Sequence, residues 1–489
     1  MRLLSVAQVV GRLLIVLAFI FLVPAWLAYS LAEDYMAFLE AFLMTFSLGL
    51  FLKIYSNKAE MHFTHKEAFA TVFLSWILLT IFGSFPYALM ELGVDNFRFP
   101  DAIFETISGF TTTGSSVIRH IESMPKSLLL WRSMTQWIGG MGIIVLFLAI
   151  LPMLGAGGFQ LYRAEIPGPS KDKLSPKTKH TATYLWVIYI GLTCLCFISL
   201  YLTGDMNWFD AICHAFTTVS TGGYSTKDAS VKAFDSWSIE TIIILFMFVS
   251  SCNFGLLILL MKGKVKNVIQ NSELRTYLFL ITIVIIFITL QHHWFVEPES
   301  AWIESFRKTT FQVMTLISST GFSTDDFDLW TPLCHVFIII IMITGGCAGS
   351  TSGGLKIFRF MVMIKMTMKE VKKMIHPRAI YNVKADKTDL KDDLILIILG
   401  FVVLYASFVF LSMILLLSFE GHQYSLISLL GVSVSCISNI GPGFMEFGPT
   451  DNFYLFSDAS KYWLSFLMLL GRLEFYSALV LFHPDFWKR

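Results

Sequence analysis

Charged residues are scarce in this sequence. Asp, Glu, Lys and Arg make up 15% of the 489 residues and hydrophobic residues 55%, whereas soluble proteins carry about 25% charged residues. A soluble globular protein is therefore excluded, and the composition predicts an integral membrane protein. Several apolar runs reach the roughly 20 residues that a helix needs to cross a bilayer, which favours helices over a β-barrel. The run from Leu13 to Ala32 is expected to be a retained helix and not a signal peptide.

Motifs of enzymes and of nucleotide-binding proteins are also missing. The sequence has no HExxH, no GxSxG and no paired carboxylates, and it has neither a P-loop nor a GxGxxG in a strand-turn-helix context. We therefore expect no enzyme, no cofactor bound by this chain and no nucleic-acid partner. The seven cysteines lack the paired spacing of zinc sites or disulfides and are expected to be small core residues.

The apolar runs form a repeating pattern after two N-terminal helices at about 9–32 and 35–54. Each repeat consists of a helix, a short amphipathic helix, a polar loop and a second helix, so internal repetition predicts the fold. We expect an all-α polytopic membrane protein with ten transmembrane helices, in which four units surround one pore in quasi-fourfold arrangement. The expected boundaries are an N-terminal extension at 1–60 and units at 61–160, 175–265, 270–375 and 388–489. The second helices of the units are expected from Trp131 to about 154, at about 237–262, from about 333 and at about 462–483.

The four polar loops are rich in hydroxyl groups and glycine although long apolar runs flank them. They are Thr111-Thr112-Thr113-Gly114, Ser220-Thr221-Gly222-Gly223, Ser318-Ser319-Thr320-Gly321 and Ser438-Asn439-Ile440-Gly441. A short helix that ends inside the bilayer points its negative C-terminal end at the membrane centre, which favours a cation there. Glycine allows backbone angles that turn carbonyl groups toward an axis, and carbonyl rings suit large monovalent cations, potassium foremost. Ordinary turns between helices are the alternative, but they do not explain four aligned glycines.

Side chains around these loops extend the prediction. The first hydroxyl of each loop is expected one layer deeper than the carbonyls, at Thr111, Ser220, Ser318 and Ser438. Asp101 and Asp210 precede Gly114 and Gly223 by the same distance and are expected to be N-caps of the first two short helices. Lys308 and Ser428 occupy the aligned positions of the other two units, so this capping is not fourfold.

A glycine-rich segment interrupts the second helix of the third unit. It reads Gly345-Gly346-Cys347-Ala348-Gly349-Ser350-Thr351-Ser352-Gly353-Gly354. No continuous membrane helix favours five glycines and three hydroxyls in ten residues, and irregular backbone at this depth is tolerated where it lines a cavity. We predict a flexible flap beneath the loops; the alternative is a break between two separate short helices.

Other polar positions in the second helices have competing interpretations. Arg472 lies in the last apolar run, where an ionisable residue indicates function, although a structural ion pair or a bond to flap carbonyls is the alternative. Glu474 is two residues away and is not expected to be its sole partner. Close helix packing is the expected role of residues 139–142 and 253–255.

Basic residues cluster at 53–66, 163–179, 262–275 and 356–391. All four clusters fall on one face if ten helices span the membrane and the polar loops re-enter from the opposite face. The positive-inside rule then predicts that both termini are cytoplasmic. The segment from Lys356 to Lys391 directly follows the flap and is a candidate docking surface, although positive-inside retention alone also explains it.

Over essentially its whole length the chain resembles the Trk/Ktr/HKT superfamily of potassium transporters, and most closely the bacterial Trk-type channel subunits. Its four loop glycines, Gly114, Gly223, Gly321 and Gly441, match the family's filter glycines, and the two extra N-terminal helices favour the Trk branch. Gly114 implies preference for potassium, since family members with serine there tend to conduct sodium. Asn439 and Ile440 depart from the family's hydroxyl pattern, which makes the filter only quasi-fourfold.

The resemblance also implies how transport is controlled. In the family the flap obstructs the pore as a gate, and Arg472 would project into the permeation path beside it. The family forms homodimers with one pore in each subunit, and a cytosolic TrkA-like ring subunit that binds NAD or ATP regulates them. The expected function is potassium uptake across the bacterial cytoplasmic (inner) membrane. Potassium is the expected transported ion, and sodium or other monovalent cations are expected to pass less well. A cation-coupled (H⁺ or Na⁺) potassium symporter is the alternative, which parallel repeats disfavour.

Overall fold

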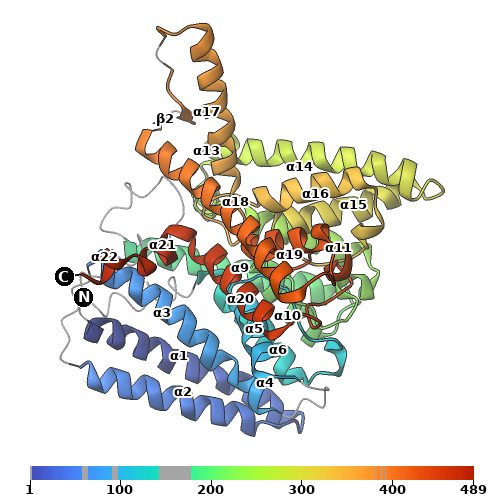
Figure 1. Cartoon of the computed structure of the whole chain (residues 1–489). Coiled ribbons are helices and arrows are strands. Elements are labelled where there is room, and N and C mark those ends of the chain that lie inside the picture. The colour runs from blue at the N-terminus through green and yellow to red at the C-terminus, as the bar shows by residue number, and fades with distance from the viewer. Residues whose placement is uncertain are drawn as a thin grey trace.

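The structure is a computed structural model and describes residues 3–57, 64–90, 97–142, 178–379, 381–386, 388–390 and 392–488. It is an all-helical polytopic protein in which long helices run side by side (Figure 1). Within the described ranges, six helices are long and apolar enough to cross a membrane, or eight if each of two bent helix pairs counts as one span.

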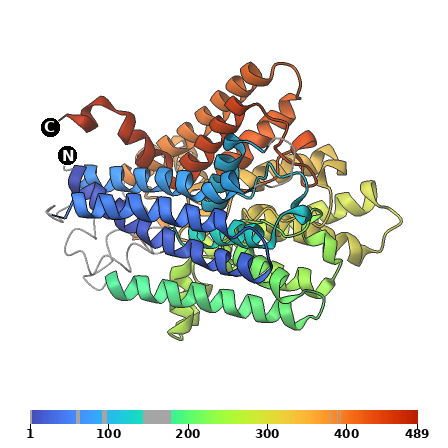
Figure 2. The same cartoon turned by 90° about the horizontal axis from the view of Figure 1, so that it is seen from below.

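The two N-terminal helices, α1 (Leu3–Ser30) and α2 (Met36–Tyr55), form a hairpin against the remainder of the chain (Figures 1 and 2). A Cβ on Gly11 would lie 2.8 Å from the carbonyl oxygen of Gly49, so the absence of side chains lets the two helices approach closely. At the turn between them, the Glu33 carboxylate accepts the backbone N–H groups of Lys126 (2.8 Å) and Ser127 (2.9 Å). Glu33 therefore caps helix α6 (Lys126–Gly140) and joins the hairpin to the first unit.

The other helices follow the expected order in each unit. The first helices are α3 (His65–Gly83) with its continuation α4 (Phe85–Leu89), α9 (Thr178–Leu202), α14 (Ser272–Gln291) and α18 (Asp392–Glu420). The short helices are α5 (Phe99–Phe110), α10 (Trp208–Val219), α15 (Trp302–Ile317) and α19 (Leu426–Ser438). The second helices begin with α6, α11 (Trp237–Ser251), α16 (Pro332–Thr344) and α20 (Asp458–Leu473). Shorter helical segments are α13 (Val265–Ile269), α22 (Pro484–Trp487), η1 (Ile121–Ser123), η4 (Ser230–Phe234), η5 (His292–Val296), η6 (Phe327–Leu329), η7 (Met445–Phe447) and η8 (Val480–Phe482).

The second helices are broken, which corrects the expectation of continuous helices at 237–262 and 462–483. Helix α11 is followed by α12 (Phe254–Met261) at 98°, and α20 by a segment that starts with α21 (Phe475–Leu479) at 113°. The Asn253 side chain accepts the N–H of Gly255 (2.7 Å) and thereby starts α12 as a new helix. Glu474, with φ of 56°, has left-handed backbone that a helix cannot continue.

The break in the third unit falls at the glycine-rich segment predicted as a flap, between α16 and α17 (Ile357–Ile375). In the first unit α6 ends at Gly140, whereas its helix was expected to reach about 154. Residues 143–154 lie outside the described residues, and so does the part of the predicted basic clusters at 163–177. Of residues 253–255, Asn253 caps α12 and Phe254 is buried, while a Cβ on Gly255 would meet only the Asn253 side chain. The close helix packing expected there stays a prediction.

The N-cap assignments also need correction. Asn207 caps α10 by accepting the N–H of Asp210 (2.9 Å), so Asp210 lies in the first turn and not at the cap. Asp101 likewise lies inside α5 and accepts the N–H of Arg98 (2.9 Å) from there. Both carboxylates still complement the positive helix end. Asp101 does so within a reciprocal capping arrangement, whereas Asp210 accepts a hydrogen bond from the side-chain amide of Asn207 (2.8 Å).

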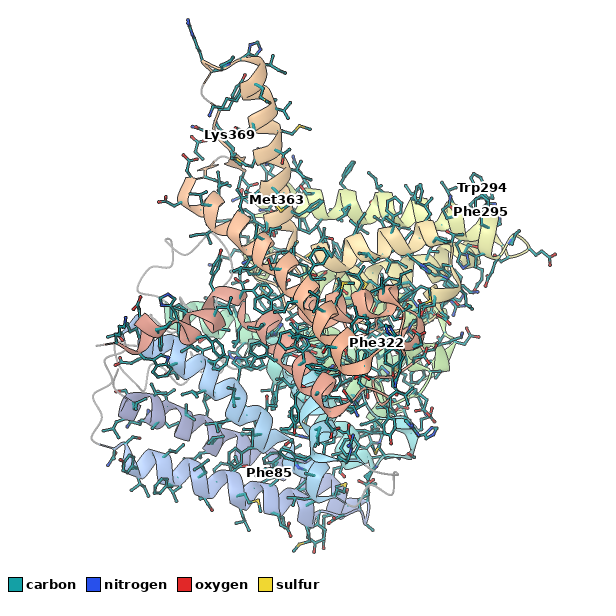
Figure 3. All side chains as sticks on the ribbon, viewed as in Figure 1. Phe85, Trp294, Phe295, Phe322, Met363 and Lys369 are labelled. Carbon is teal, nitrogen blue, oxygen red and sulfur yellow. The ribbon has the colours of Figure 1, made fainter. Side chains whose placement is uncertain are left out.

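Helix α17 extends away from the other helices and carries Met363 and Lys369 (Figures 1 and 3). Beyond it, β1 (Lys384–Ala385) pairs antiparallel with β2 (Thr388–Asp389), a small exception to the all-α prediction. The two termini lie at the same end of the molecule (Figures 1 and 2). At this end the Lys66 ammonium joins the start of α3 to the C-terminal segment by donating to the carbonyl groups of Asp485 (3.2 Å) and Lys488 (2.9 Å).

Candidate ion pathway

The four polar loops have the same backbone conformation. We number them in chain order: loop 1 (111–114), loop 2 (220–223), loop 3 (318–321) and loop 4 (438–441). The second residue of each is left-handed, with φ of 54° at Thr112, 54° at Thr221, 55° at Ser319 and 53° at Asn439. The fourth residue also has positive φ, 88° at Gly114, 76° at Gly223, 85° at Gly321 and 113° at Gly441. Left-handed backbone is costly for residues other than glycine, so its recurrence shows that all four loops are constrained to turn their peptides away from the helix direction.

The glycines bring the loops into contact in a closed cycle. A Cβ on each glycine would collide with the carbonyl oxygen of the residue that precedes the glycine in the next loop. The pairs are Gly114 with Gly222, Gly223 with Thr320, Gly321 with Ile440, and Gly441 with Thr113 (2.9 Å). Loop 1 thus contacts loop 2, loop 2 contacts loop 3, loop 3 contacts loop 4, and loop 4 contacts loop 1. The four carbonyl oxygens therefore gather in one place, where no side chain larger than hydrogen fits.

The first hydroxyl of each loop lies at the C-terminal end of its short helix and is fully buried. Thr111 donates to the carbonyl oxygen of Ile107 (2.6 Å), and Ser220 and Ser318 donate to carbonyl oxygens one turn back in α10 and α15 (3.3 Å each). The Ser438 hydroxyl bonds to that of Tyr405 (2.7 Å). A hydroxyl whose proton is donated in this way keeps lone pairs that can face a cation.

Two amide side chains make the loops unequal. Gln136 of α6 donates to the carbonyl oxygen of Gly222 (2.6 Å) and accepts the N–H of Tyr224 (3.0 Å), which holds loop 2 from behind. Asn439 donates to the hydroxyl of Thr113 (2.9 Å) and so links loop 4 to loop 1. Asn439 departs from the hydroxyl pattern of the other loops, and asparagine is the non-glycine residue that tolerates left-handed backbone well. Gln136 was not predicted, although an amide in a membrane helix was a signal that could have identified it.

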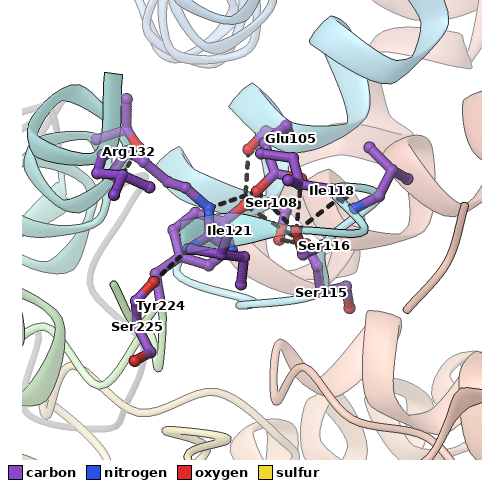
Figure 4. A network of polar contacts seen from close by, with 12 residues as sticks. Glu105, Ser108, Ser115, Ser116, Ile118, Ile121, Arg132, Tyr224 and Ser225 are labelled. Carbon is purple, nitrogen blue, oxygen red and sulfur yellow. Dashed lines mark hydrogen bonds and ion pairs between the residues drawn. The ribbon is translucent and has the colours of Figure 1, made fainter. Parts of the chain in front are cut away.

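A buried ion pair supports the outer parts of loops 1 and 2 (Figure 4). Arg132 of α6 donates to the carboxylate of Glu105 on α5 (2.6 Å), and both side chains are almost fully buried. Glu105 also accepts the N–H of Val117 (3.0 Å), while Arg132 donates to the carbonyl of Ser225 (2.9 Å) and lies 3.5 Å from the ring centre of Tyr224. Removing one partner of such a pair costs about 3–5 kcal/mol. The sequence analysis missed both residues, although charges inside an apolar unit were a visible signal.

The flap, residues 345–354, lies against three of the loops. The Gly353 N–H donates to the hydroxyl of Ser319 in loop 3 (2.6 Å), and the hydroxyls of Thr351 and Thr221 in loop 2 lie 3.1 Å apart. A Cβ on Gly353 would collide with the carbonyl oxygen of Ser438 in loop 4. The second, left-handed residues of loops 2 and 3 thus hold the flap through their side chains.

Arg472 joins the flap to the first unit. Its guanidinium donates to the carbonyl oxygens of Thr351 in the flap (3.0 Å), Gly140 at the end of α6 (3.0 Å) and Gly139. The residue therefore has the bond to a flap carbonyl that was the alternative interpretation. Glu474 pairs instead with Arg359 of α17 (2.7 Å), as its position had indicated.

The close packing expected at Gly139 and Gly140 is present. A Cβ on Gly139 would collide with the carbonyl oxygen of Phe110, and a Cβ on Gly140 would lie 2.6 Å from the Cβ of Ser220. The end of α6 therefore packs directly behind loops 1 and 2. The same closeness places the carbonyl groups of Gly139 and Gly140 within reach of Arg472.

The segment after loop 3 is buried around Phe322, which lies in the middle of the molecule (Figure 3). Further along this segment, the pKa of Asp328 is raised to about 7. Burial is the largest cause, a hydrogen bond from the Met445 backbone opposes it, and the carboxylates of Asp326, Asp451 and Glu446 add to it. The folded protein therefore favours protonated Asp328. The resulting contribution to stability is fully present below the ordinary pKa of 3.8, falls as the pH rises, and is gone above about 7.

We predict that the thermal unfolding midpoint of the purified protein falls between about pH 5 and pH 7, levels off above about pH 7, and that Asp328→Asn reduces this fall. The physical reason is that ionisation places a charge on a buried carboxyl group and close to the carboxylates of Asp326, Asp451 and Glu446. Differential scanning fluorimetry in detergent over this pH range is the measurement. The exposed Glu299→Gln serves as control and should leave the pH dependence unchanged; an equal effect of both variants would contradict the assignment.

Comparisons with known proteins agree with this geometry. The profile of the TrkH family, described as a cation transport protein, matches residues 34–489. The Trk system potassium uptake protein TrkH of Escherichia coli (strain K12) is 36% identical over 487 residues, which is 99% of each chain. TrkG of the same strain is 34% identical over 458 residues, 92% of this chain and 91% of that protein.

Among solved structures, the crystal structure of the potassium transporter TrkH from Vibrio parahaemolyticus superimposes with a TM-score of 0.87 at 32% sequence identity and covers 100% of both chains. The resemblance inferred from the four loops is thereby confirmed. The chain belongs to the TrkH family of cation transport proteins, and so to the transporters and not to the enzymes.

Proposed function

We propose that this protein takes up potassium across the bacterial cytoplasmic membrane through a selectivity filter made by loops 1 to 4. The observation that carries the proposal is the closed cycle of contacts between each glycine and the carbonyl group of the next loop. Four carbonyl groups gathered at one place can replace the hydration shell of a large monovalent cation. Potassium is the transported ion in this proposal, and the chain binds no cofactor.

The arrangement in the membrane follows from this proposal. Ten helices span the bilayer, two in the extension at 1–60 and two in each unit at 61–160, 175–265, 270–375 and 388–489. The units surround one pore in quasi-fourfold order, and both termini are cytoplasmic. Supporting observations are the shared end of the two termini and the basic side chains of α17, among them Lys365, Lys369 and Lys372.

The flap and Arg472 are proposed to form the gate on the cytoplasmic side of the filter. The bonds from the flap to loops 2 and 3 and to Arg472 support a closed position directly beneath the carbonyl groups. The positive charge of Arg472 adds an electrostatic barrier for cations at this depth. A permeating ion needs the flap to leave this position.

We predict that Arg472→Ala raises the basal cation flux several-fold, because the change removes both the bonds to the flap and α6 and the positive charge. Flux into liposomes, normalised to protein content, is the measurement. Arg472→Lys keeps the charge but not the forked donor geometry. Low flux in the lysine variant would identify the positive charge as the barrier. Flux in the lysine variant as high as in the alanine variant would identify the hydrogen bonds to the flap and α6 as the barrier. A folded alanine variant with unchanged flux would contradict both roles.

Regulation is proposed to come from a cytosolic ring subunit that binds NAD or ATP and docks around residues 356–391. Helix α17 starts directly after the flap and extends beyond the other helices, so a partner that moves this helix pulls on the flap (Figure 1). Its exposed face combines apolar residues, Ile364, Met368, Val371 and Ile375, with lysines. A homodimer with one pore in each subunit completes the proposal.

Flux into liposomes with separate potassium and sodium gradients tests the proposed function. A filter predicts passive potassium flux down its own gradient and little sodium flux. Uptake that requires a proton or sodium gradient would show a coupled symporter instead. Absence of potassium flux from folded, reconstituted protein would contradict both functions.

A further inference from the structure

The first half of the flap lies along the break between α11 and α12. We call residues 250–254, which span this break, the seat. The Cys347 N–H donates to the carbonyl of Ser251 (3.0 Å), and the Phe254 N–H donates to the carbonyl of Gly349 (3.0 Å). Thr351 donates to the carbonyl of Ser250 through its N–H (3.3 Å) and its hydroxyl (3.1 Å). The flap is thus attached to the second unit as well as to the loops.

Two free cysteines face each other across this attachment. Cys252 of the seat lies between the two backbone bonds that join residues 251 and 254 to the flap, and its neighbour in the flap is Cys347. The backbone bond from Cys347 to Ser251 brings the Cys347 side chain next to that of Cys252. Cys347 is 0% and Cys252 6% exposed, so both thiols are enclosed between the flap and the seat. The remaining cysteines include the exposed Cys194 and the buried Cys334 at the far end of α16.

We infer that Cys252 and Cys347 form a redox lock, in which oxidation to a disulfide fixes the flap to the seat and keeps the ion pathway closed. The inference rests on the proposed gating by the flap. A disulfide requires the sulfur atoms at about 2.05 Å. Two neighbouring thiols on segments that backbone hydrogen bonds already join need only a small displacement to reach this distance. The flap backbone can follow, because Gly345, Gly346 and Gly349 surround Cys347 in sequence.

The chemistry requires a two-electron oxidant, and an azodicarboxamide such as diamide is a small one. One thiolate adds to the N=N bond, which takes up a proton and gives a sulfur–nitrogen adduct. The second thiolate then attacks that sulfur, the S–S bond forms, the S–N bond breaks, and the leaving nitrogen takes a second proton. The two thiols have lost two electrons and two protons, and the azo compound has gained them as a hydrazine.

The cellular setting makes such a pair reversible. Thiols on the cytoplasmic side of a membrane are kept reduced by the glutathione pool, so the flap is free to move under ordinary conditions. Oxidative conditions would close the pathway until a reductant reopens it. An open flap carries Cys347 away from the seat, whereas the disulfide forbids this separation.

The test uses full-length protein in liposomes with a potassium gradient, in a Cys194→Ser background that removes the exposed thiol. Potassium flux is measured before diamide, after diamide and after dithiothreitol. We expect the flux to fall at least about tenfold with diamide, a change of 1.4 kcal/mol in the opening equilibrium, and to return with dithiothreitol. Cys252→Ser and Cys347→Ser should be insensitive, and Cys334→Ser should remain sensitive.

Mass spectrometry of the same samples follows disulfide formation independently of the flux. This measurement needs no further cysteine variant. Flux that persists although the 252–347 disulfide has formed would overturn the inference, as would failure of the disulfide to form or an equal loss of flux in Cys347→Ser. Absence of potassium flux before any oxidant is added contradicts the proposed function itself, so the two failures are distinguishable.

Discussion

Deletion of residues 347–352 is expected to raise basal potassium flux at least tenfold, the largest effect that we predict for any change outside the filter. The deleted residues carry the bonds to loop 2, to Arg472 and to the seat. A net hydrogen bond contributes about 1 kcal/mol, and 1.4 kcal/mol corresponds to a factor of ten, so loss of two such bonds is sufficient. Flux into liposomes, at equal amounts of folded protein, is the measurement.

The deletion variant contains its own control, because the loops are untouched. An open gate above an intact filter should still prefer potassium over sodium. High flux without selectivity would show that the filter has collapsed, and unchanged flux from well-folded protein would contradict the role of the flap as gate.

Gly114→Ser is expected to lower the permeability ratio of potassium to sodium at least tenfold. The serine Cβ would collide with the carbonyl oxygen of Gly222, so one of the four gathered carbonyl groups has to move. Left-handed backbone costs a residue with a Cβ a further energy of about 1–2 kcal/mol. Reversal potentials or ion-specific flux in liposomes with paired potassium and sodium gradients give the ratio.

Gly204→Ser is the matched control for this substitution. Gly204 has φ of 82°, close to the 88° of Gly114, but a Cβ there would have no neighbour within 4 Å. The control variant therefore carries the same backbone strain without displacing a carbonyl group. Unchanged selectivity in Gly114→Ser, or equal loss in both variants, would contradict the assignment of Gly114 to the filter.

The helix order and the four loops were predictable because they depend on local pattern. Apolar runs of sufficient length predict helices, and hydroxyl-glycine segments between them predict where those helices stop. Gly114, Gly223, Gly321 and Gly441 stood out by alignment alone, and all four have positive φ in the structure. The cyclic contacts between loops join residues more than 90 positions apart and could not be derived from spacing.

The breaks of the second helices were predictable only where glycine accumulates. The flap was visible for that reason, whereas the apolar runs through Cys252 and Leu473 contain neither proline nor a glycine cluster at the break. The Asn253 side chain starts α12 by accepting the N–H of Gly255, and at Glu474 the chain turns where Arg359 of another helix pairs with it. The first is a lone local cap, which is a weak signal in a sequence, and the second is a tertiary contact, which a single sequence does not display.

Side chains behind the loops were missed for a related reason. Gln136, Arg132 and Glu105 lie in segments that read as helices, and their value comes from partners on other elements. Asp101 and Asp210 were recognised as residues of the helix start but placed at the cap, because a carboxylate in the first turn and one at the cap give the same pattern of charge. Only the backbone distinguishes the two positions.

The central claim is that the four loops form one cation site, and anomalous diffraction from crystals grown with thallium in place of potassium tests it most directly. The account predicts an anomalous peak enclosed by the carbonyl oxygens of Thr113, Gly222, Thr320 and Ile440, and a weaker peak there in Gly114→Ser. Well-ordered loops without a peak among these four oxygens, in crystals where thallium is bound elsewhere, would contradict it.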